Sequence, residues 1–170
     1  LITVIFASIS LIVSKIFLHK EYRSSVSLYV MNNKVTQNTG EILSSDISAS
    51  QMLVDTYAVI LSDNLVMEDI SNSLIKKYGA DKLSKIIVEK DGGYAIPSSA
   101  ISSCISMGSV NETEVLRVIA TTRDPQVSVD ICLAMIDVAP KVLSDVMGVA
   151  YVNPIGYPEL MGGSSSPNVL

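Results

Sequence analysis

The stretch TEVLRVIATTRDPQVSVDICLAMIDVAPKVLSDVMG, residues 113–148, decides the fold, because two different periodicities meet inside it. Residues 113–124 alternate with apolar side chains on both faces, which is typical of a central strand covered on both sides. Asp124 is a strong N-cap and Pro125 suits the first helical position, so a helix is expected to begin at this corner. Its apolar stripe recurs every three or four residues and consists of Val127, Ile131, Met135, Val138, Val142 and Val146.

The chain before this corner predicts one strand and two long helices. Residues 22–32 alternate between apolar and polar side chains, which indicates a strand, and the polar residues 33–45 indicate a loop. Helical spacing of apolar residues then predicts helices over 47–61 and 64–78. The polar break at 62–64 offers the second helix a new N-cap.

Shorter elements complete the predicted α+β fold, a mixed β-sheet packed against long helices. Residues 82–90 are compatible with a short helix or a strand, and 98–105 predict a short helix. Pro140 predicts a kink in the helix after the Asp-Pro corner. Residues 149–153 predict a last short strand.

The first residues predict a transmembrane helix over 1–20. Residues 1–14 carry no charge, and Lys15 lies close enough to the polar flank to extend its amine to the headgroups. Because the first residue is Leu, the numbering is expected to begin inside a longer apolar segment. A buried core helix is the alternative, whereas bulky Phe17 and Leu18 fit a signal-peptide cleavage site poorly.

The last residues, 154–170, predict an extended segment without sheet partners. They contain Pro154, Pro158 and Pro167 together with a run of Gly and Ser. Proline fixes φ and removes a backbone donor, so neither a helix nor a central strand is expected here. Such a segment suits a strap that holds a spacing.

Composition argues against several classes of function. The 170 residues carry a net charge of −5, so no positive field for nucleic acid is expected. Two cysteines and one histidine are too few for a disulfide scaffold or a His/Cys metal site. Cys104 and Cys132 are expected to be buried thiols, and a disulfide between them is the alternative. The acidic pair Glu112 and Glu114 is interpreted as solvated charge. We therefore expect no enzymatic activity, no cofactor and no metal.

Four local features, taken in order, resemble the Wzz chain-length determinant family, also called polysaccharide co-polymerases. An apolar segment precedes YRSSVSLYV, TEVLRVIATTRDPQVSVDI joins a strand to a helix, that helix carries VAP, and the end reads NP…YP…SSSPN. The closest similarity is to the Gram-positive branch, the membrane adaptors of capsule and exopolysaccharide tyrosine kinases. The family-motif residues matched here, expected to act in structure and assembly, are Asp124, Pro125, Pro154, Pro158, Pro167 and Asn168.

The resemblance implies a chain organised around the plasma membrane. It implies a first transmembrane helix over 1–20, an extracytoplasmic domain over 21–153, and a Pro-rich segment over 154–170 that leads to a second transmembrane helix not present in the sequence. Such proteins are non-enzymatic scaffolds that form homo-oligomeric rings and act with a Wzy-type polymerase and a tyrosine kinase to set polysaccharide chain length. The stretch 86–104 is longer than expected in the family's short members.

Two surfaces and one loop are candidates for binding. For subunit contacts we expect the helix surfaces around 47–78 and the face of 125–147 opposite the core. The alternative function is an extracytoplasmic ligand-binding or sensor domain. Such a domain needs a concave pocket, and the loop 87–103, with Tyr94 and Pro97, is the expected place for it. Contact between the domain and the polysaccharide is left open by the sequence.

Overall fold

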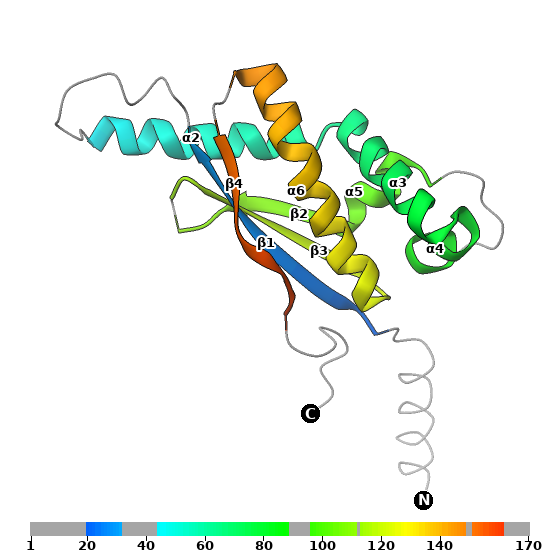
Figure 1. Ribbon diagram of the computed structural model, residues 1–170. Helices are drawn as coiled ribbons and strands as arrows, with labels where there is room; N and C mark the ends of the chain where they lie inside the picture. The colour runs from blue at the N-terminus through cyan, green and yellow to red at the C-terminus, as the bar shows by residue number, and fades with distance from the viewer. Residues whose placement is uncertain (1–19, 32–43, 89–95, 112, 149–150, 162–170) are drawn as a thin grey trace, which may run out of the picture.

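The computed structural model describes residues 20–31, 44–88, 96–111, 113–148 and 151–161. Within these residues the fold is α+β, with four strands and five helices (Figure 1). The strands are β1 (Tyr22–Met31), β2 (Ile105–Ser109), β3 (Val115–Thr122) and β4 (Tyr151–Leu160). The helices are α2 (Ser44–Leu61), α3 (Asn64–Tyr78), α4 (Ala80–Ile87), α5 (Ser98–Cys104) and α6 (Pro125–Met147).

The four strands form one sheet in the order β2-β3-β1-β4. Every neighbouring pair is antiparallel, with β1 and β3 in register from Tyr22 opposite Thr122 to Tyr29 opposite Val115. The predicted mixed sheet is therefore wrong. The helices between β1 and β2, and α6 between β3 and β4, each return the chain to the same end of the sheet, as a parallel pair requires. Another strand lies between the two connected strands in both cases, so no two neighbouring strands are parallel.

One face of the sheet carries the core. Val26, Leu28 and Val30 of β1 are buried on the same face as Leu116 and Val118 of β3. The helices cover this face, with α6 lying diagonally across β1, β3 and β4 (Figure 1).

The opposite face of the sheet is not covered by the described helices. Arg117 of β3 is exposed there, and Ile119 and Thr121 are only half-buried. The prediction that this strand is covered on both sides is therefore wrong for one of its faces. When helices cover one face of an antiparallel sheet, buried and exposed residues alternate along its strands.

Two of the long helices, α3 and α6, begin and end at capping residues. Asp63 caps α3 by accepting a hydrogen bond from the backbone N–H of Leu65 at 2.9 Å, and Gly79 ends the helix with a positive φ of 80°. Asp124 caps α6 through the backbone N–H groups of Gln126 and Val127, at 2.8 and 3.1 Å. These caps explain why the predicted helix over 64–78 and the predicted start of α6 are confirmed.

Other boundaries differ from those predicted. Residues 80–87 form a helix, and the strand β2 follows α5 directly, where a helix was predicted to continue through 105. The helix α6 continues through Pro140, and the kink expected at this residue stays a prediction. The predicted loop over 33–45 lies largely outside the described residues.

The strand β4 is longer than predicted. It passes through Pro154 and Pro158 and pairs with β1 as far as Leu160, so the expectation of a segment without sheet partners is wrong for its first part. The strand lies at the edge of the sheet, where proline is tolerated because one side needs no backbone donor. The pairing shifts register between Ser25 and Ser27, where β4 bulges.

The start of β1 and the end of β4 lie at the same end of the sheet (Figure 1). The backbone N–H of Met161 donates to the carbonyl of Arg23 at 2.8 Å. The polypeptide therefore enters and leaves the described domain side by side. The transmembrane helix predicted over 1–20 falls almost entirely outside the described residues, and none of the described helices is both long and apolar enough to cross a bilayer.

Candidate functional site

A groove of about 570 Å³ lies between three helices. The end of α2 and the start of α3 form one wall, and the last turns of α6 form the other. We call this feature the apolar groove. Its lining consists of Val59, Ile60, Asp63, Leu65, Val66, Asp69, Val142, Asp145 and Val146.

Large apolar side chains in and around this groove face solvent. Val59 is 72% exposed, Leu65 is 73% exposed and Val146 is 61% exposed. Single exposed apolar residues are ordinary on protein surfaces, but a group of them around one hollow marks a site for binding. The sequence predicted Val146 as part of the buried stripe of its helix, and the structure shows that this last position is not covered.

Acidic side chains form the rim of the apolar groove. Asp69 and Asp145 are exposed, and neither makes a hydrogen bond or an ion pair within the described residues. Asp63 is the N-cap of α3. The lining contains no Lys or Arg; Lys141 lies one turn before Asp145 on α6, outside the lining, and has no ion pair in the described part of the chain.

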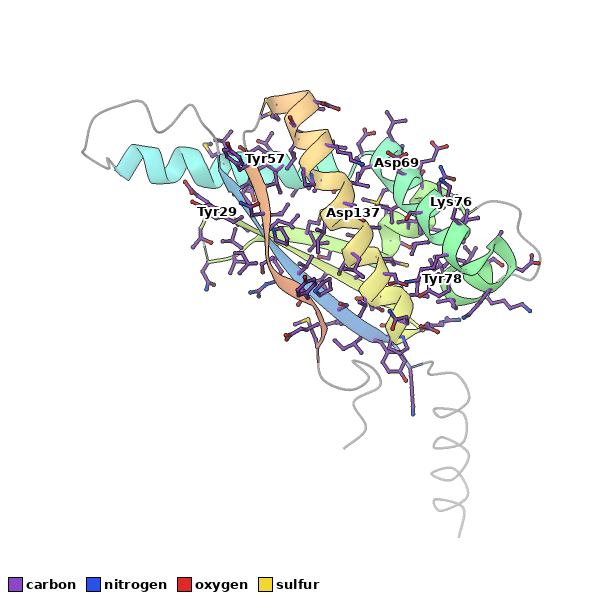
Figure 2. The ribbon with its side chains drawn as sticks, in the orientation of Figure 1. Tyr29, Tyr57, Asp69, Lys76, Tyr78 and Asp137 are labelled. Carbon is purple, nitrogen blue, oxygen red and sulfur yellow. The ribbon has the colours of Figure 1, made fainter. Side chains whose placement is uncertain are left out.

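A polar cluster lies at the other end of the contact between α3 and α6. The carboxylate of Asp130 is only 5% exposed and forms an ion pair with the amine of Lys77 at 2.7 Å. It also accepts a hydrogen bond from the hydroxyl of Tyr78. The side-chain amide of Gln126 reaches the second oxygen at 3.4 Å. Figure 2 shows Tyr78 at the end of α3, turned toward the start of α6. We call these four residues the Asp130 cluster.

The electrostatics of the Asp130 cluster favour the charged aspartate and the neutral tyrosine. Burial by itself raises the pKa of Asp130, but hydrogen bonds from Lys77 and Tyr78, together with the lysine charge, outweigh it and lower the pKa below its usual value. Burial and the same carboxylate raise the pKa of Tyr78 well above its usual range. Lys82 also lies over the Tyr78 ring, with its amine 5.1 Å from the ring centre.

The Asp-Pro corner holds β3, α6 and the start of β1 together. The hydroxyls of Thr122 and Ser128 are 2.8 Å apart, and Ser128 donates to the carbonyl of Tyr22 at 2.9 Å. With Asp124 capping α6 and Pro125 as its first residue, these contacts give the motif a structural role. The motif lies at the opposite end of α6 from the apolar groove.

The other motif residues are Pro154, Pro158, Pro167 and Asn168. Pro154 and Pro158 lie in the edge strand β4, whereas Pro167 and Asn168 lie outside the described residues. Cys104 and Cys132 are free thiols, and burial raises the pKa of Cys132 to about 11, so this thiol is inert at neutral pH.

Two smaller hollows lie elsewhere on the domain. One of about 360 Å³ opens on the uncovered face of the sheet, beside Ser27, Arg117, Glu159 and Tyr157. The other, of about 230 Å³, is lined in part by Pro97 from the loop that was proposed as a ligand site. That volume lies below the range of about 300–1,000 Å³ that is typical of ligand pockets. Tyr94 of the same loop lies outside the described residues.

Within the described ranges, no group of three or more His, Cys, Asp or Glu side chains is arranged to hold a metal ion. Glu114, half of the acidic pair noted in the sequence, accepts a hydrogen bond from the hydroxyl of Tyr29 at 3.2 Å, while Glu112 is not described. Comparison with protein-family models, with curated proteins and with solved structures finds no match to this chain.

Proposed function

We propose that this chain is a non-enzymatic membrane scaffold that regulates the length and export of a capsular polysaccharide or exopolysaccharide. In this proposal the described domain lies outside the plasma membrane, and several copies assemble into a ring. The ring works with a Wzy-type polymerase and serves as the membrane adaptor of a bacterial tyrosine kinase. The sequence resemblance supplies the identity of these partners.

The observation that carries the proposal is the adjacency of the two ends of the domain. The backbone hydrogen bond from Met161 to Arg23 places the end of β4 beside the start of β1. In a domain that lies between two membrane helices, the chain must enter and leave the domain at the same surface. The apolar stretch over 1–18 precedes β1 directly, so both ends can face the same leaflet.

The apolar groove supports an assembling protein over a sensor. It is larger than the hollow beside Pro97, and one of its walls belongs to the helix surfaces around 47–78 that the sequence proposed for subunit contacts. Exposed apolar side chains with a polar rim are the usual composition of a protein interface. A membrane anchor would confine copies to two dimensions and so strengthen weak lateral contacts.

The proposal is tested with the full-length protein in lipid nanodiscs. We expect native mass spectrometry to find several copies in one disc. In intact cells we expect a cysteine placed at exposed Ser73, in the middle of α3, to react with a membrane-impermeant maleimide. The matched control keeps only the native cysteines, one of them buried. A monomer in every disc, or labelling that appears only after lysis, would contradict the proposal.

A further inference from the structure

The two ends of α3 carry opposite charge. The start of the helix contributes Asp63 and Asp69 to the rim of the apolar groove. Its end and the following helix α4 carry four lysines, and we call this region the lysine corner: Lys76, Lys77, Lys82 and Lys85. Figure 2 labels Asp69 and Lys76 along the same helix, toward its opposite ends.

Some of these charges are available for a partner. Lys76 and Lys82 are exposed and make no hydrogen bond or ion pair within the described residues, and the amine of Lys82 lies over the ring of Tyr78. Lys77 is engaged by Asp130, and Lys85 has a partner of its own. Asp81 is the acidic residue within this region. Lys76 and Lys82 are therefore the two amines that we expect to bind across an interface.

The charge of the apolar groove rules out a copy of itself as its partner. A groove packed against a second groove would bring two sets of three carboxylates together, and like charges across an interface cost several kcal/mol. Its apolar floor needs a partner with apolar surface, and its rim needs cations. The lysine corner supplies cations, and the two helices that carry them also carry the partly exposed apolar side chains of Ile75, Tyr78 and Ile86.

The matching surfaces cannot meet within one molecule. Asp69 and Lys76 are seven residues apart on a straight helix, which separates them by about 10 Å along its axis. We propose that the apolar groove of one copy receives the lysine corner of a second copy, with Asp69 and Asp145 facing Lys76 and Lys82. This contact rests on the proposed function, and it names the surfaces through which the scaffold assembles.

Two charge-reversal variants of the full-length chain in nanodiscs test the contact. One carries Asp69→Lys and Asp145→Lys, and the other carries Lys76→Glu and Lys82→Glu. Each variant alone places like charges across the interface, and we expect its self-association to weaken by more than about tenfold. An equal mixture of the two variants restores opposite charges at every contact, so assembly should return. Asp63 is left unchanged because it caps α3.

The matched controls reverse charges outside both surfaces. Asp137→Lys changes an exposed residue on α6, and Arg117→Glu changes one on the open face of the sheet. Both should assemble as the wild type does, and circular dichroism should show that all variants are folded. We also expect wild-type assembly to weaken as salt rises, because exposed charge pairs are screened.

The possible outcomes separate this contact from the proposed function. Recovery in the mixture, with each variant alone impaired, supports the contact. Variants that assemble alone like the wild type overturn the contact and leave the scaffold proposal in place. Folded variants that stay monomeric when mixed also overturn it. A monomeric wild type overturns the contact and the assembly on which the proposed function depends.

Discussion

The helices α3 and α6 meet at both ends, and the two ends differ in how completely their polar groups are paired. Where α3 ends, Asp130 is nearly buried and is held by Lys77, Tyr78 and Gln126. Where α3 begins, Asp69 faces solvent without a partner in the described part of the chain, beside the exposed side chain of Leu65. We call the end with Asp130 the closed end of this helix pair, and the end with Asp69 and Leu65 the open end.

We interpret the closed end as contributing to the stability of the fold and the open end as contributing to binding. A buried carboxylate stabilises a fold only when its hydrogen bonds are complete, and the Asp130 cluster meets that condition. Exposed apolar groups and unpaired charges contribute little to the stability of one molecule, so they are free to contribute to contacts with another. We therefore expect substitutions at the closed end to change stability and substitutions at the open end to change assembly.

The largest effect on stability is expected from Asp130→Ala. The substitution removes an acceptor of charged hydrogen bonds and leaves Tyr78 without its partner, which should cost about 2–3 kcal/mol of the free energy of unfolding. The loss of the ion pair with Lys77 contributes less to this cost, because the Lys77 side chain is 56% exposed and can be solvated. Thermal unfolding followed by circular dichroism should show a decrease of roughly 5 °C or more.

The matched control for this substitution is Asp137→Ala. Asp137 lies on the same helix but is exposed and has no partner within the described residues, and Figure 2 labels it in the middle of α6. Its removal should change the free energy of unfolding by less than about 0.5 kcal/mol. Equal losses in the two variants would show that the Asp130 cluster is no more important than surface charge.

A smaller effect is expected from pH. The pKa of Asp130 is lower in the folded protein than its usual value, so the charged form stabilises the fold. This contribution is complete above the unfolded pKa of about 3.9 and is lost as pH falls through the folded pKa. The stability difference between the wild type and Asp130→Asn should therefore be constant from about pH 5 to 7 and shrink below about pH 4. A difference that is the same at pH 3 and pH 7 would contradict this assignment.

The elements that the sequence predicted best are those with local start and stop signals. Asp63 and Gly79 bound α3, while Asp124 and Pro125 begin α6. These signals act within a few residues, so they can be recognised without knowledge of the tertiary structure.

Elements whose identity depends on distant pairing were predicted less well. Strand β2 is five residues long, includes Gly108 and follows α5 without a break. Strand β4 contains two prolines and is a strand because β1 pairs with it across more than 120 residues of chain. The local pattern at either segment favours another structure, and long-range hydrogen bonds override it.

The candidate site was predicted only in part. Helical periodicity located one wall of the apolar groove, the surfaces around 47–78, but it placed Val142 and Val146 of the other wall in the apolar stripe of α6, because it cannot show where a covering helix ends. The Asp130 cluster was missed entirely. Asp130 lies 52 residues from Tyr78 in sequence, and a lone aspartate in a helix is usually a surface charge.

The smallest effect on stability is expected at the open end. Leu65→Ser combined with Val146→Ser removes two exposed apolar side chains of the groove, so the free energy of unfolding should change by less than about 0.5 kcal/mol per site. Assembly in nanodiscs should nevertheless weaken, because a contact in the groove would bury both side chains. Met52→Ser is the matched control, since Met52 is 73% exposed on α2 but does not line the groove. If the double variant unfolds more easily and assembles normally, the groove contributes to stability and not to assembly. The proposed difference between the two ends of α3 is then wrong.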